Sequence, residues 1–223
     1  MLASLGATLG VFLSADLFTT FVFFEIMSFT SFVLVIHDES DTALKAAKTY
    51  LAVAVVGGLV TLMGIFMVYH QCQTLFYNEL IGAVDTVADP GLLMISGILV
   101  LTGFAAKAGM FPLHAWLPIA HPVAPAPASA VLSGLITKMG VFAIIRVVYY
   151  LYGWDFLSGT WVQRTVLILS LVTVLMGSTL ALREDTLKKR LAYSTVSQVS
   201  YVIFGLMLLT PAALEGAIFQ VVF

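Results

Sequence analysis

Three ionisable side chains interrupt hydrophobic stretches of this sequence. Glu25 follows a phenylalanine-rich run, and Lys107 and Lys138 each lie inside a long apolar segment. A charge near the centre of a bilayer costs roughly 2.5–3.5 kcal/mol on insertion scales, so a residue that carries one usually has a function. Moving a carboxylate relative to an amine changes which group prefers to hold a proton, and this set of residues therefore favours proton movement.

Two histidines and an arginine extend this set. His114 and His121 lie between the two lysines, and an unperturbed imidazole titrates near pH ~6.5, so either could relay protons through water. The structural alternatives are that His114 caps backbone carbonyls freed by nearby prolines and that His121, which precedes Pro122, only supports the backbone. Arg146 either anchors its helix or neutralises a carboxylate from another segment.

The three buried charges also have structural alternatives. Glu25 and one lysine could form a static ion pair that only fixes the register of two helices. Lys107 lies about four residues from a predicted helix end, so its ammonium could snorkel to the interface. Lys138 lies near the middle of its segment, where snorkelling is hard.

Composition defines the class of protein that must position these residues. Of 223 residues, 61% are hydrophobic and only 10% are charged, which indicates a polytopic membrane protein with one membrane domain over residues 1–223. The net charge of −2 offers no basic field for nucleic acid. With Cys72 as the one cysteine and with no nucleotide, zinc or acyl-transfer motif, we expect no metal, no cofactor and no catalytic chemistry in this chain.

Hydropathy predicts an all-α bundle of about seven transmembrane spans, with one proline-broken helix and one truncated span. The predicted spans cover residues 1–13, 17–36, 46–69, 90–111, 127–152, 162–182 and 191–209. Residues 212–223 would cover only about 18 Å as a helix, so we expect the chain to stop inside a span. Between the two lysine segments, the proline-rich connection 112–126 is uncharged, and we interpret it as extended backbone that lines a protein cavity.

Positive charges predict the orientation. The connectors 37–45 and 183–190 fall on the same side of the predicted bundle and carry most of the basic residues outside the spans. The positive-inside rule therefore places both connectors in the cytoplasm.

Three ordered sequence blocks resemble one known family. The main block reads Lys-Ala-Gly-Met-Phe-Pro-Leu-His-Ala-Trp-Leu-Pro from Lys107 and continues through His121 to Lys138 and Arg146; the others begin at Asp16 and Asp185. These blocks resemble the antiporter-like proton-translocating subunits of respiratory complex I, energy-converting hydrogenases and multisubunit sodium/proton antiporters, in the last case those of the D type. The residues of these blocks resemble those of the hydrogenase and antiporter members more than those of typical complex I.

The resemblance implies roles and partners. It implies that Glu25 pairs with Lys107, that Lys138 is the central lysine of the next helix and that His114 follows the helix break. The family has about fourteen spans, so the resemblance implies that this chain is a fragment. It also implies partner membrane subunits, a peripheral redox module or antiporter subunits, protons or sodium as the transported ions, and the inner or plasma membrane of a prokaryote.

Two further hypotheses compete with proton translocation. In the first, the chain is a non-pumping scaffold subunit of such a complex, and its buried ion pair is static. In the second, the chain carries an organic solute at the broken helix. The second is disfavoured because the connection 112–126 offers few convergent polar groups besides its two histidines.

Overall fold

The computed structural model of the protein describes residues 1–222, except for the side chains of residues 84 and 85. The described residues form helices and no strands, which confirms the all-α prediction; an isolated bridge joins Asp16 to Phe76. The predicted domain 1–223 ends on Phe223, which lies outside the described residues. In order, the elements are α1 (Leu2–Leu13), α2 (Leu17–Val35), α3 (Asp41–Cys72), α4 (Tyr77–Leu80), η1 (Ala83–Thr86), α5 (Pro90–Ala108), η2 (Leu113–Ala115), α6 (Trp116–Val123), α7 (Ala126–Val131), η3 (Leu132–Ile136), α8 (Thr137–Arg146), η4 (Val147–Tyr152), α9 (Trp154–Leu157), α10 (Trp161–Arg183), α11 (Leu187–Met207) and α12 (Pro211–Val222).

Five helical segments of the described chain are long and apolar enough to cross a membrane. They are Leu17–Val35, Asp41–Cys72, Pro90–Val123, Ala126–Tyr152 and Trp161–Arg183. The predicted number of seven full spans is therefore not confirmed. Helices α1 and α12 are apolar but have only 12 residues each, and the first turn of α11 carries three basic residues, which lower its hydropathy.

The connection 112–126 is mostly helical, so its interpretation as extended backbone is wrong. Helix α5 ends at Gly109, whose positive φ of 82° suits glycine, and the chain resumes as η2 and α6. Pro118 lies in the first turn of α6, where a backbone N–H needs no partner within the helix, and Pro122 lies at the end of that helix. The predicted helix break is present, between α5 and η2.

Helices α3 and α5 pack closely, and this packing positions the last turn of α5, which carries Lys107. A methyl group at Gly103 would lie 1.7 Å from Thr61 Oγ1 and 2.4 Å from the Gly57 carbonyl, and one at Gly64 would lie 2.7 Å from the Ser96 carbonyl. Glycines at these positions let the two backbones approach closely, as small residues do between membrane helices.

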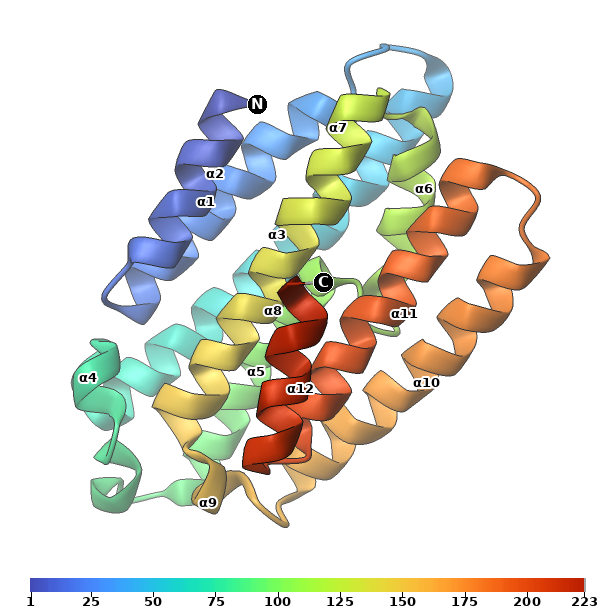
Figure 1. Ribbon diagram of the computed structural model, residues 1–223. Coiled ribbons are helices and arrows are strands. Elements are labelled where there is room, and N and C mark those ends of the chain that lie inside the picture. Colours follow the sequence, from blue (N-terminus) through green and yellow to red (C-terminus); the bar gives the residue numbers. More distant parts are fainter. Residues whose placement is uncertain (223) are drawn as a thin grey trace.

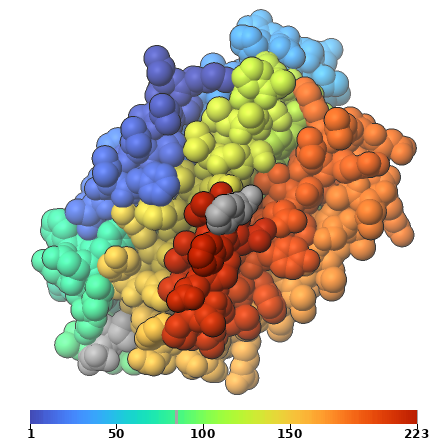
Figure 2. Space-filling view, in the orientation of Figure 1, coloured from blue at the N-terminus to red at the C-terminus, as the bar shows by residue number. Residues whose placement is uncertain are grey.

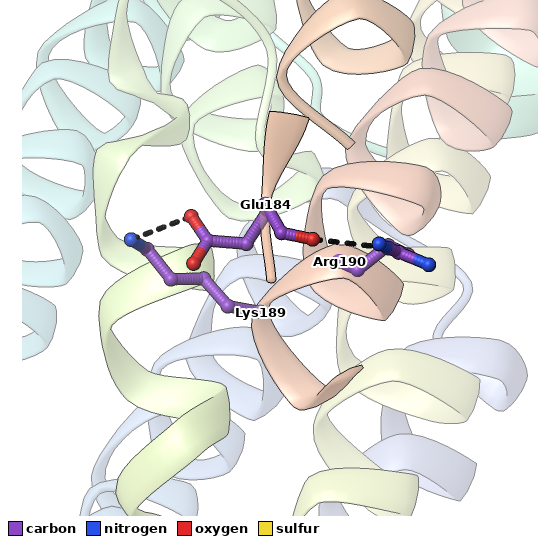
Figure 3. Close-up of polar contacts among 3 residues, drawn as sticks. All are labelled: Glu184, Lys189 and Arg190. Carbon is purple, nitrogen blue, oxygen red and sulfur yellow. Dashed lines mark hydrogen bonds and ion pairs between the residues drawn. The ribbon is translucent and has the colours of Figure 1, made fainter. Parts of the chain in front are cut away.

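The connectors fall at two ends of the bundle. The turn after α2 and the turn between α10 and α11 lie at the same end as α6 and α7, whereas α4 and α9 lie at the opposite end (Figure 1). In the turn between α10 and α11, Lys189 Nζ lies 2.7 Å from Glu184 Oε2, and Arg190 Nε donates to the Glu184 carbonyl at 3.1 Å (Figure 3). The hydrogen bond from Lys189 lowers the pKa of the half-buried Glu184 carboxyl below its usual value.

Candidate functional site

Lys107 lies in the last turn of α5 and is only 3% exposed. Its ammonium donates a hydrogen bond to the Tyr50 hydroxyl and lies 4.2 Å from the centre of the Tyr50 ring and 5.8 Å from that of Trp116. The Trp116 indole N–H donates to the Ala106 carbonyl at 2.8 Å, which holds α6 against the end of α5. The aromatic rings and the hydroxyl therefore enclose Lys107, and the structure does not support the snorkelling alternative.

Glu25 faces the same region from α2 but does not contact Lys107. The half-buried carboxylate packs on Gly58 of α3, where a methyl group would lie 2.7 Å from Glu25 Oε1. That oxygen is buried and has no hydrogen-bond partner. Among the described residues, Lys189 and Glu184 form the one ion pair within 4.0 Å. Glu25 and Lys107 therefore attract each other only across a longer distance.

Lys138 lies in the first turn of α8, directly after the π-helical segment η3. Its side chain is half-buried, and Nζ donates to the Val221 carbonyl at 2.8 Å, where α12 packs on the surface beside α11 (Figure 2). Lys138 lines a cavity of about 780 Å³ between α7, α8, α11 and α12, which has room for many water molecules. Other polar residues that line the cavity are His121, Ser129, Ser133, Lys188, Ser194, Thr195, Gln198 and Gln220.

The two histidines have different surroundings. His121 is 3% exposed, and its Nδ1 lies 2.5 Å from Ser129 Oγ, while Nε2 is buried without a partner. His121 and Lys138 therefore line one cavity. His114 stacks on Phe111 with the ring centres 5.9 Å apart, has a buried Nδ1 without a partner and lines neither this cavity nor the one beside Lys107.

Arg146 lies at the far end of α8 and binds the end of α1. Nη1 donates to the Ser14 carbonyl at 2.8 Å and to Ser14 Oγ at 2.9 Å, and Nη2 donates to the Phe12 carbonyl at 2.6 Å. The guanidinium carbon also lies 4.9 Å from the centre of the Tyr77 ring and 4.7 Å from that of Phe142. Because a helix end leaves carbonyls unpaired and partly negative, these contacts match the anchoring alternative.

We expect Arg146→Ala to reduce stability, because it removes charged hydrogen bonds to carbonyls at the end of α1. The free energy of unfolding should fall by at least ~1.5–3 kcal/mol, measured by denaturant titration of the purified protein in detergent. Arg164→Ala is the matched control, since Arg164 is exposed. Equal stabilities of the two variants would show that the contacts of Arg146 with α1 contribute nothing.

The sequence interpretation missed the hydroxyl groups around Lys107. Tyr50 is 1% exposed and hydrogen-bonds to Ser31, which is fully buried on α2. A cavity of about 10 Å³, enough for roughly one water molecule, lies between Lys107, Tyr50 and Ser28. The sequence signal for these groups is that polar residues recur inside the spans of α2 and α3.

Comparisons with known proteins agree on the family of the chain. The family model for NADH:quinone oxidoreductase/Mrp antiporter transmembrane proteins matches residues 14–223. The chain is similar to a Na(+)/H(+) antiporter subunit of Alkalihalophilus pseudofirmus, at 32% identity over 95% of this chain and 42% of the relative. It is also similar to hydrogenase-4 component B of Escherichia coli, at 31% identity over 98% of this chain and 35% of the relative.

A solved structure shows the same fold. A chain of the Mrp complex from Dietzia sp. matches with a TM-score of 0.90 and 28% identity, over 99% of this chain and 41% of that chain. The chain spans less than half the length of each of these relatives. By the family match and this common fold, it belongs to the NADH:quinone oxidoreductase/Mrp antiporter family, as an antiporter-like membrane subunit.

Proposed function

We propose that this chain is the part of an antiporter-like subunit that moves protons, with Glu25, Lys107, His114 and Lys138 as the relay. The observation that carries the proposal is the environment of Lys107, which is 3% exposed and has a neutral hydroxyl as its hydrogen-bond partner. Burying an ammonium without a contacting carboxylate is costly. A lysine kept in such a place is suited to gaining and losing a proton as distant charges change.

The layout favours two relay centres. Glu25 and Lys107 form the first, around α2, α3 and α5. Lys138 and His121 form the second, because they line the large cavity beside α11. His114 lies after the helix break between them, and its unpaired Nδ1 is free to bind a water molecule. His121 could relay or support the backbone, and we assign Arg146 the structural role.

The proposal extends to topology and partners. We propose that α11 also crosses the membrane and that the shorter α1 lies within it, all in one domain, and that the connectors 37–45 and 183–190 face the cytoplasm. Both connectors lie at the same end of the bundle, as this orientation requires (Figure 1). The relatives belong to an Mrp antiporter and to a hydrogenase, so the partners we propose are other membrane subunits, together with a redox module or antiporter subunits.

The rival hypothesis is a scaffold with a static ion pair. A static pair needs the carboxylate and the ammonium in contact, whereas Glu25 and Lys107 are not paired within 4.0 Å and Glu25 Oε1 has no hydrogen-bond partner. These two observations favour the relay.

Glu25→Gln tests the proposal in the full-length subunit within its assembled complex. The amide keeps the shape and removes the charge that acts on Lys107, so proton translocation into vesicles should fall at least about tenfold, the equivalent of ~1.4 kcal/mol. Assembly, followed by native electrophoresis, should not change. Glu39→Gln is the matched control, because Glu39 is exposed in the turn after α2. Normal translocation by Glu25→Gln would refute the role of Glu25, and loss of assembly would favour the scaffold.

A further inference from the structure

The ammonium of Lys107 is connected to the Glu25-bearing helix through Tyr50. Tyr50 lies on α3 and accepts the hydrogen bond from Lys107. Its hydroxyl also hydrogen-bonds to Ser31 and lies 3.4 Å from the Ser28 carbonyl, both on α2. All four residues are at most 3% exposed, so water does not compete freely for these bonds.

Counting protons gives this chain of bonds a direction. Ser31 Oγ lies 2.7 Å from the Met27 carbonyl and 3.0 Å from the Ser28 carbonyl, so its single proton has an acceptor on its own helix. The Tyr50 hydroxyl accepts from the ammonium and has one proton of its own, which it donates to Ser31 or to the Ser28 carbonyl. Each bond therefore points from Lys107 to α2.

The same chain of bonds is not a path for proton transfer. It ends on backbone carbonyls of α2, which accept hydrogen bonds but do not take up a proton to pass on. The phenol keeps its proton throughout. Tyr50 is therefore suited to responding to the charge of Lys107, not to conducting its proton.

The response follows from the two protonation states of the amine. An ammonium has only donors, so Tyr50 must accept from it and is left to donate to α2. A neutral amine has a lone pair, which competes with Ser31 and the Ser28 carbonyl for the one proton of Tyr50. Losing the proton from Lys107 thus weakens the hydrogen bonds that join Tyr50 of α3 to α2.

We propose that Tyr50 is a positioning residue of the relay, which holds the ammonium of Lys107 and transmits its protonation state to α2, the helix of Glu25. This inference rests on the proposed function. Glu25 is the other titratable group that acts on both Lys107 and Tyr50. The small cavity lined by Phe24, Ser28, Tyr50 and Lys107 lies between the lysine and α2 and has room for about one water molecule.

Tyr50→Phe tests this role in the full-length subunit within its complex. The variant keeps the ring that lies beneath the ammonium and 5.0 Å from Trp116, and it removes only the hydroxyl. We expect proton translocation to fall at least about fivefold, the loss of one hydrogen bond of ~1 kcal/mol. The pH of half-maximal translocation should move by about half a unit or more, a change that a purely structural role would not produce.

Tyr149→Phe is the matched control, because the buried Tyr149 hydroxyl has no hydrogen-bond partner to lose. Ser31→Ala provides a second test if Tyr50→Phe assembles poorly, since it removes an acceptor of Tyr50 and should move the pH midpoint in the same direction. An unchanged rate and pH midpoint in both Tyr50→Phe and Ser31→Ala would overturn this inference. If these variants translocate normally while Lys107→Ala does not, the inference alone fails; if Lys107→Ala translocates normally, the proposed function fails.

Discussion

We expect Lys107→Ala to abolish proton translocation while leaving the complex assembled. This is the expected result if the buried amine is a proton carrier, because Lys107 is the one buried lysine among the described residues. We expect the translocation rate to fall at least about a hundredfold, which corresponds to a barrier raised by ~2.7 kcal/mol or more. The measurement is the quenching of a pH-sensitive dye in vesicles, energised by the redox substrate of the complex or by an imposed sodium gradient.

Whether substitution of Lys107 raises or lowers the unfolding temperature separates a proton carrier from a scaffold residue. Replacing a buried charge by an apolar side chain of similar length is often neutral or stabilising, so Lys107→Met should unfold at the same temperature as the parent or above it. A scaffold role requires both transport and stability to fall. Lys189→Met is the control, since Lys189 forms a partly exposed ion pair with Glu184 in the turn between α10 and α11. Normal translocation by Lys107→Ala would refute the proposed relay.

The sequence alone predicted the all-α class and identified the charged residues inside apolar segments. Charges inside apolar segments are expensive wherever the chain folds, so Glu25, Lys107 and Lys138 could be identified without coordinates. Local sequence also accounts for Asp16, which precedes a hydrophobic segment and whose carboxylate accepts from the Thr19 N–H at 2.7 Å at the start of α2. Local chemistry was enough in these cases.

Features that depend on tertiary packing could not be predicted. The prolines of the connection 112–126 suggested irregular backbone, but Pro118 lies in the first turn of α6, where a missing N–H is tolerated, and Pro122 lies in its last turn, where it removes only one helix bond. The donor role of Tyr50 depends on the positions of three helices, because Tyr50 lies on α3 and its partners lie on α2 and α5.

The relation between the charges was also only partly predictable. The pairing of Glu25 with Lys107 came from family resemblance, and in the structure the two interact without contact. The binding of Arg146 to the end of α1 depends on residues more than 130 positions away. Hydropathy finds the helices but does not specify which helix ends meet.

Lys138 is the residue for which two substitutions can separate charge from proton exchange. Lys138→Ala removes the amine from the cavity that it shares with His121, and we expect translocation to fall at least about a hundredfold. Lys138→Arg keeps the positive charge, but a guanidinium does not release its proton in proteins. A relay therefore requires Lys138→Arg to be as inactive as Lys138→Ala, with both complexes assembled.

The arginine variant also tests the opposing view directly. If Lys138 only supplies charge, or only holds α12 through the Val221 carbonyl, arginine should restore most of the activity, because it also donates to carbonyls. Lys45→Ala is the matched control, since Lys45 is exposed in the first turns of α3 and lines neither cavity. Activity in Lys138→Arg close to that of the parent would remove Lys138 from the relay and leave Lys107 as its amine, because proton exchange at this position would then not be needed.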